Sequence, residues 1–178
     1  MELIQTQQKT AFDAIKRDIA WTNNMHTKRI QKEVIYVGVA KMTKDKGKVE
    51  LVANRLAKIT GQKPASRGAK KAISTYKTRV GDHVGYQITL RGKRAEDFLN
   101  RLVHIALPRT KDFKGISANG IDDMGNYTLG IKEHTVFPET ADEDIKDIFG
   151  MAVTVVTTAK GKKEAKAYLT HLGFPFKK

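Results

Sequence analysis

The sequence predicts an α+β fold: a mostly antiparallel sheet with helices packed on one face. Segments with helical and strand periodicity follow each other in the order α β α β β α β, short α, β α. That order lacks the regular strand–helix alternation of a parallel sheet. The chain has 178 residues, 40% of them hydrophobic, and contains no linker long enough to divide it. We therefore expect a single domain over residues 1–178.

Apolar residues that recur every three or four positions predict the helices. Glycine favours the left-handed turn after a helix and proline cannot continue one, so Gly61, Pro108 and Gly173 are expected to end three of them. A short acidic helical turn is expected at residues 142–149. The main helical segments cover residues 12–19, 49–59, 98–105 and 165–172.

Runs of β-branched and aromatic residues predict the strands. Residues 33–39 (EVIYVGV) are apolar on both faces, which indicates a central strand. Loops are expected at residues 21–29 and 111–124, and a charged turn is expected around Gly47. The other predicted strands cover residues 72–78, 86–90, 127–133 and 151–157.

Positive charge dominates the composition and is concentrated in one segment. The chain has 33 Lys and Arg against 19 Asp and Glu, a formal net charge of +14. Residues 51–94 hold eleven of these basic residues, opposed only by Asp82. Such a segment favours a polyanion as partner, nucleic acid first and an anionic membrane surface second. Lysine and arginine neutralise phosphates, and amides and hydroxyls such as those of Gln62 and Thr89 can reach ribose groups.

Catalytic and metal-binding patterns are weak or missing in the sequence. There is no cysteine, and no two of the five histidines stand three or four residues apart. Gly115 and Gly120 resemble the start of a phosphate loop, but Ile121 and Asp122 follow where lysine and serine or threonine are needed. The acidic residues 142–144 fit the first turn of a helix better than a catalytic cluster. We expect no catalysis, cofactor or metal, and neither a membrane span nor a secretory signal.

Several motifs stand in the order found in one known family. Together they make the chain resemble large-subunit ribosomal protein five in its bacterial form, over residues 30–178. The motifs are ITGQKP (59–64), ITLRG (88–92), FLNRLVHIALPR (98–109), DFKGIS (112–117), GNYTLGIKE (125–133), VFPE (136–139), VTTAK (156–160) and GFPF (173–176).

The resemblance implies a cytoplasmic protein of the large ribosomal subunit that binds 5S rRNA in the central protuberance. The family's RNA-contacting glutamine and threonine correspond to Gln62 and Thr89, and Arg91 beside them can hold a phosphate. Tyr36 stands where the family has an asparagine. Either that contact is lost, or the tyrosine replaces it by stacking and hydrogen bonding. Met124 stands where the family has an arginine, which puts an RNA contact at that loop in doubt.

The resemblance also implies a basic loop at residues 65–75 that reaches the peptidyl-site tRNA, with further contacts to large-subunit rRNA, neighbouring ribosomal proteins and the head of the small subunit. Its candidate residues are Ser66, Arg67, Lys70 and Lys71. The segment has one large apolar residue and like charges, so we expect it to be mobile until it meets phosphate. The alternatives are an RNA-modifying or RNA-processing enzyme and a nucleic-acid binder without shape selectivity.

Overall fold

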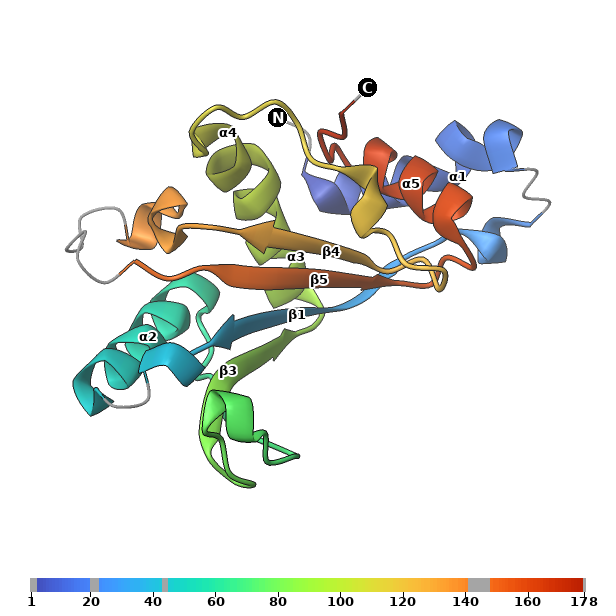
Figure 1. Ribbon diagram of the computed structural model, residues 1–178. Coiled ribbons are helices and arrows are strands. Elements are labelled where there is room, and N and C mark those ends of the chain that lie inside the picture. Colours follow the sequence, from blue (N-terminus) through green and yellow to red (C-terminus); the bar gives the residue numbers. More distant parts are fainter. Residues whose placement is uncertain (1–2, 20–22, 43–44, 141–147, 178) are drawn as a thin grey trace. The chain divides into compact units, whose positions relative to one another are not determined.

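The computed structural model describes residues 3–19, 23–42, 45–140 and 148–177 (Figure 1). It confirms the α+β class, with a five-stranded sheet in the order β2-β3-β1-β5-β4. The strands are β1 (Ile30–Gly38), β2 (Ala65–Gly68), β3 (His83–Leu90), β4 (Tyr127–Ile131) and β5 (Met151–Thr157). The α-helices are α1 (Ile4–Ile19), α2 (Lys46–Thr60), α3 (Lys93–Arg101), α4 (Leu107–Arg109) and α5 (Lys162–His171).

Strand β1 is central in the sheet, as its apolar sequence predicts. Its two faces differ, however: Ile35 and Val37 are 1% exposed, whereas Tyr36 is 41% exposed. Side chains alternate between the faces of a strand, so one face of β1 is buried and the other is open at Tyr36. Strand β5 shows the same alternation of buried and half-buried positions. The predicted central strand is therefore confirmed, although its apolar residues bury only one face.

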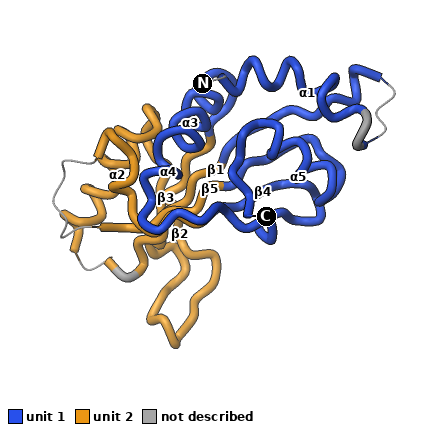
Figure 2. The backbone as a smooth tube through the Cα atoms, turned by 90° about the horizontal axis from the view of Figure 1, so that it is seen from above, with its two compact units in different colours: residues 1–33, 90–129, 154–178 blue, residues 34–89, 130–153 orange. Residues whose placement is uncertain are grey.

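The chain forms two compact units (Figure 2). Unit 1 comprises residues 1–33, 90–129 and 154–178, and unit 2 comprises residues 34–89 and 130–153. The boundaries between them fall inside β1, β3, β4 and β5, so each of these strands contributes to both units. The single domain over residues 1–178 stays a prediction.

Unit 1 is built around α1, which packs against α3 and α5. Phe98 and Leu99 of α3 and Tyr168 and Leu169 of α5 are completely buried. Helix α5 ends before Gly173, whose φ of +84° suits a residue without a side chain. The predicted last helix and the glycine that ends it are therefore both confirmed.

Unit 2 is built around α2, which buries Val52, Leu56 and Ile59. The helix ends at Gly61 in the left-handed conformation, as predicted. Buried Arg55 of α2 lies with its Nη1 atom 3.2 Å from Nε2 of His134. The imidazole of His134 in turn stacks on Phe149, with the ring centroids 4.1 Å apart. This stack ties the segment after β4 to the segment before β5.

Three predicted elements differ in the structure. The segment 72–78 is not a strand, because Ser74–Tyr76 is a 3₁₀ turn, and the strand in this region is β2. The helix that starts at Lys93 does not stop before Pro108: a π turn at Leu102–Ala106 leads into α4. Gly47 lies inside α2 rather than in a turn. The acidic turn predicted at 142–149 falls mostly outside the described residues.

Candidate nucleic-acid interface

Tyr36 lies across the neighbouring strand β3. A Cβ atom added at Gly85 would lie 2.8 Å from the Tyr36 Oη and 2.6 Å from the carbonyl oxygen of Val37. The tyrosine ring therefore occupies the place that a side chain at position 85 would need. Because Tyr36 remains 41% exposed, part of its ring is open to solvent and can serve as a stacking platform.

Gln87 and Thr89 share the face of β3 on which Tyr36 lies. They follow Gly85 at intervals of two residues, and such residues point to the same side of a strand. Arg67 of β2 reaches this face as well, since its Nε donates a hydrogen bond of 2.7 Å to Oε1 of Gln87. The three strands thus present an aromatic ring, an amide, a hydroxyl and a guanidinium on one surface of unit 2.

The end of α2 holds Gln62 against the same strand. Nε2 of Gln62 lies 3.4 Å from the carbonyl oxygen of Thr89 and donates to it. Thr60 supports this position, because its buried hydroxyl donates to Leu56 and lies within 3.3 Å of the Gln62 backbone nitrogen. Within the described part of the chain, Oε1 of Gln62 and Oγ1 of Thr89 have no intramolecular hydrogen bond. Both atoms are therefore available to an external partner.

We call this surface the polar sheet face: Tyr36, Gln62, Arg67, Gln87 and Thr89. The structure brings together three of the four residues predicted to bind 5S rRNA. It also adds Gln87, which the sequence reading missed, although the alternation of polar and apolar residues in YQITL places Gln87 beside Thr89 on one face.

Arg91, the fourth predicted residue, belongs to unit 1 and is fully on the surface. It lies in the turn between β3 and α3 and precedes Gly92, which has a φ of +57°. Lys93 and Arg94 follow and are also exposed. The turn therefore presents three cations within four residues, a suitable contact for a phosphate backbone.

The segment after Pro64 forms a paired hairpin, which we call the basic arm (residues 65–83). Its first strand, β2, pairs antiparallel with β3, with Ser66 opposite Tyr86. The pairing continues through Ala69, whose backbone nitrogen donates to Asp82 at 2.8 Å. The expectation of an unpaired loop from residue 65 is therefore wrong.

The predicted tRNA-proximal residues lie in two places, the outer part of the basic arm and the polar sheet face. Ser66 is exposed on β2, and Lys70 and Lys71 are exposed in the bend that follows. Arg67 belongs instead to the polar sheet face. The arm also exposes Ile73 (47%), Tyr76 (75%) and Val80 (69%), so it carries apolar surface among its cations. Tyr76 and Val80 are not among the predicted tRNA-proximal residues, because the predicted loop ends at residue 75.

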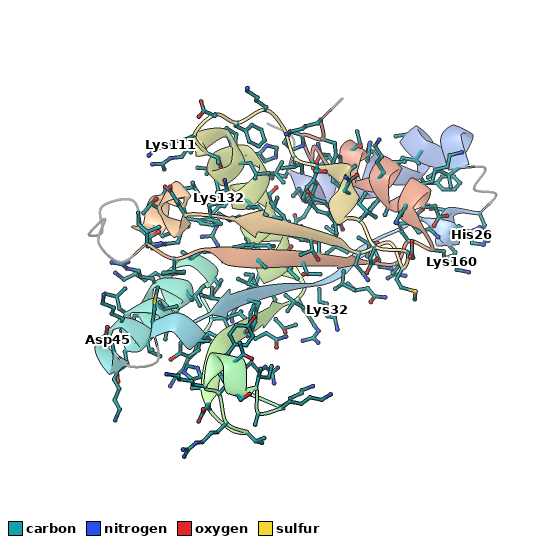
Figure 3. The ribbon with its side chains drawn as sticks, viewed as in Figure 1. His26, Lys32, Asp45, Lys111, Lys132 and Lys160 are labelled. Carbon is teal, nitrogen blue, oxygen red and sulfur yellow. The ribbon has the colours of Figure 1, made fainter. Side chains whose placement is uncertain are left out.

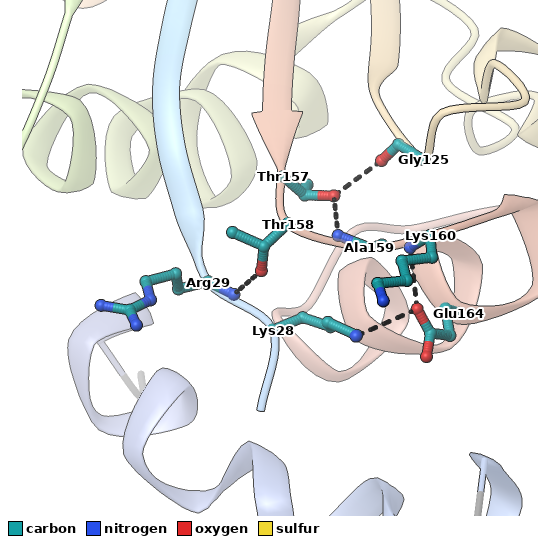
Figure 4. Close-up of polar contacts among 8 residues, drawn as sticks. All are labelled: Lys28, Arg29, Gly125, Thr157, Thr158, Ala159, Lys160 and Glu164. Atoms are coloured by element: carbon teal, nitrogen blue, oxygen red, sulfur yellow. Dashed lines mark hydrogen bonds and ion pairs between the residues drawn. The ribbon is translucent and has the colours of Figure 1, made fainter. Parts of the chain in front are cut away.

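The loop before β4 is closed by its own hydrogen bonds. The side chain of Asn126 donates to Asp122 at 2.9 Å, and this bond is the main cause that lowers the pKa of Asp122. Thr157 fixes the other side of the loop: its hydroxyl donates to the carbonyl oxygen of Gly125 at 2.7 Å (Figure 4). Met124 is 74% exposed at the tip. An uncharged side chain thus occupies the position of the family's arginine.

The described residues hold no group of three His, Cys, Asp or Glu side chains that could bind a metal ion. No helix in the described part of the chain is long and apolar enough to cross a membrane.

Two family models match the chain. One, described as ribosomal protein L5, matches residues 23–79, and the other, described as the C-terminus of the same ribosomal protein family, matches residues 83–176. A relative in Ureaplasma urealyticum, named large ribosomal subunit protein uL5, is 46% identical over 97% of this chain and 93% of its own length. Relatives of the same name are 44% identical in Dictyoglomus turgidum, over the full length of both chains, and 44% identical in Mycoplasma pneumoniae, over 96% of this chain and 95% of the relative. The chain belongs to the ribosomal protein L5 family.

Proposed function

We propose that this chain is a cytoplasmic structural constituent of the large ribosomal subunit and binds 5S rRNA through the polar sheet face. The family consists of ribosomal proteins and not of enzymes, so the alternative of an RNA-processing enzyme is not supported. The observation that carries the proposal is that Tyr36 and Gln62, which come from separate segments of the sequence, both contact β3, the strand that holds Thr89.

The chemistry of the polar sheet face suits structured RNA. The Gln62 amide oxygen can accept from a ribose 2′-hydroxyl, and the Thr89 hydroxyl can donate or accept. Arg67 supplies a guanidinium that can bind two phosphate oxygens, and its hydrogen bond to Gln87 holds it against β3. An unstacked base can lie on the open side of Tyr36. Arg91 adds a phosphate contact from unit 1.

We assign a second contact to the basic arm, namely the peptidyl-site tRNA. The exposed cations at Lys70 and Lys71 fit phosphates, and Tyr76 at the 3₁₀ turn can stack on an exposed base. The apolar residues of the arm also fit a protein neighbour, such as one in the head of the small subunit. We also propose contacts with large-subunit rRNA and with adjoining ribosomal proteins.

A binding titration tests the 5S rRNA assignment. At one salt concentration, the protein should prefer 5S rRNA over duplex DNA of equal length. Gln62→Ala and Thr89→Ala should each weaken 5S binding by about 1–3 kcal/mol, because each leaves a polar group of the RNA unpaired. Thr170→Ala, which removes an exposed hydroxyl from α5, is the matched control and should leave the affinity unchanged.

A nucleic-acid binder without shape selectivity is the second candidate, and the net charge of +14 favours it. In that case duplex DNA would bind as tightly as 5S rRNA, and both alanine variants would behave like the control. Equal affinities would therefore refute the assignment to 5S rRNA.

A further inference from the structure

Unit 1 carries a groove between α1 and α5 that the proposed RNA contacts do not use. The groove has a volume of about 470 Å³. Ala14 and Ile15 of α1 and Ala167 of α5 line it with small or apolar groups. Lys163, Lys166 and Thr170 line it from α5. These three residues are spaced by three and four positions, so they follow one face of the helix along the groove.

His171 fixes the spacing of the two helices at one end of the groove. Its Nε2 lies 2.9 Å from the backbone oxygen of Gln7, to which it donates, and 3.3 Å from the hydroxyl of Thr10. Both partners belong to α1. The groove is therefore formed in the free protein and needs no rearrangement of the helices to accept a ligand.

The groove is positively charged, and none of the residues that line it in the described part of the chain is acidic. Asp13 of α1 pairs with Lys16 at 2.9 Å, and Glu164 of α5 pairs with Lys28 at 3.3 Å. Lys163 and Lys166, in contrast, have no carboxylate within 4.0 Å in the part of the chain that the structure describes. The two ammonium groups therefore lie beside an apolar floor and form no ion pair with a described carboxylate.

We propose that this groove docks an acidic amphipathic helix of a neighbouring protein. Apolar side chains on one face of that helix would cover Ala14 and Ala167 above Ile15, which is only 3% exposed at the base of the groove. Carboxylates beside them would pair with Lys163 and Lys166. A phosphate backbone would pair with the lysines but would leave the apolar floor uncovered. The apolar floor thus favours a protein segment over RNA. This docking site is independent of the polar sheet face and the basic arm.

A synthetic helix tests the proposal on the full chain. The probe is a peptide of about 18 residues, or five turns, with leucines on one face and glutamates on both sides of them. Added to the ¹⁵N-labelled protein at about 0.1 M salt, it should shift the amide signals of Ala14, Ala167 and Thr170. A matched peptide with serine in place of leucine should bind at least tenfold more weakly.

Two variants test the groove from the protein side. Lys163→Glu with Lys166→Glu should lower the peptide affinity at least tenfold. Its control is Lys111→Glu with Lys114→Glu, an equal change of charge in an exposed loop of the same unit, which should lower it less than threefold (Figure 3 labels Lys111). Ala167→Gln places a polar side chain on the floor of the groove without changing the charge, and it should also lower the affinity for the peptide several-fold.

Four results would overturn the proposal. The serine peptide could bind as well as the leucine peptide, which would show that only charge, and not the apolar floor, holds the peptide. The control pair of substitutions could weaken binding as much as the groove pair. A short RNA duplex could shift the same amides more strongly than the peptide does, or the groove variants could lose 5S rRNA binding; either would make the groove an RNA contact. Retained 5S binding with lost peptide binding separates this site from the proposed RNA function.

Discussion

Glu33 is a carboxyl group on the buried face of β1, where Ile35 and Val37 are its neighbours in sequence. It is completely buried, and neither of its carboxyl oxygens has a hydrogen-bond partner among the described residues. Burial without a compensating partner disfavours the charged form. It raises the pKa of Glu33 from 4.5 to about 9. The carboxyl is therefore neutral in the folded protein at physiological pH.

This pKa makes the folding free energy depend on pH. Below pH 4.5 the group is protonated in both the folded and the unfolded chain, so it adds no pH dependence to the folding free energy. Between 4.5 and about 9 the unfolded chain loses the proton and the folded chain keeps it, so stability falls as pH rises. Each pH unit in this range costs about 1.4 kcal/mol, which amounts to about 4 kcal/mol between pH 5 and pH 8.

Thermal or urea denaturation of Glu33→Gln at several pH values measures this effect. Glutamine has nearly the same shape but no proton to lose, so its stability relative to the wild type should rise by about 4 kcal/mol between pH 5 and pH 8. Glu33→Leu should behave alike, with a further gain from apolar burial. Glu50→Gln, on the exposed surface of α2, controls for loss of one acidic side chain. A stability difference between Glu33→Gln and the wild type that does not change with pH would refute the reasoning.

Three further predictions concern the RNA-binding surfaces. Tyr36→Ala should weaken 5S rRNA binding in a titration by about 1–3 kcal/mol, the range for a stacked base; a lower melting temperature at unchanged affinity would assign the ring to the fold alone. Gly85→Ala should lower the unfolding free energy by about 1–3 kcal/mol in urea denaturation, because its Cβ would lie 2.6 Å from the carbonyl oxygen of Val37; unchanged stability would contradict the close packing. Lys70→Gln with Lys71→Gln should reduce cross-linking of the arm to tRNA in ribosomes and barely change the salt dependence of 5S binding; a decrease of that slope by about 2 would assign the arm to 5S rRNA.

The sequence predicted best the elements whose own hydrophobic pattern shows which residues are buried. Strand β5 matches its predicted range, because MAVTVVT is β-branched and bounded by glycine before it and polar residues after it. Helix α2 matches because Val52, Leu56 and Ile59 repeat at helical spacing and Gly61 ends it. In these segments the local pattern and the tertiary structure agree.

Strand β2 could not be predicted in this way. All four of its residues, Ala65–Gly68, are exposed, so no apolar alternation marks it. Its backbone hydrogen bonds to β3 alone make it a strand, and that pairing is a property of two segments. The same reason explains why Arg67 was expected in a loop. Pro108 was expected to end its helix for a different reason, namely that proline cannot continue one. The π turn before it lets the chain remain helical through the proline.

In the proposed RNA site too, the sequence indicates which residues are candidates, whereas the structure decides which of them lie together. The resemblance supplied Gln62 and Thr89 as separate candidates, but their contact depends on where α2 ends relative to β3. The replacement at Tyr36 makes sense only beside Gly85, because a larger residue on β3 would leave the ring no place to lie. Asparagine at position 36 would not need that space. Gly85 therefore leaves room for the tyrosine, although the carbonyl oxygen of Val37 alone would also crowd a side chain at position 85. The ring offers an aromatic surface at the position where the resemblance implies an amide.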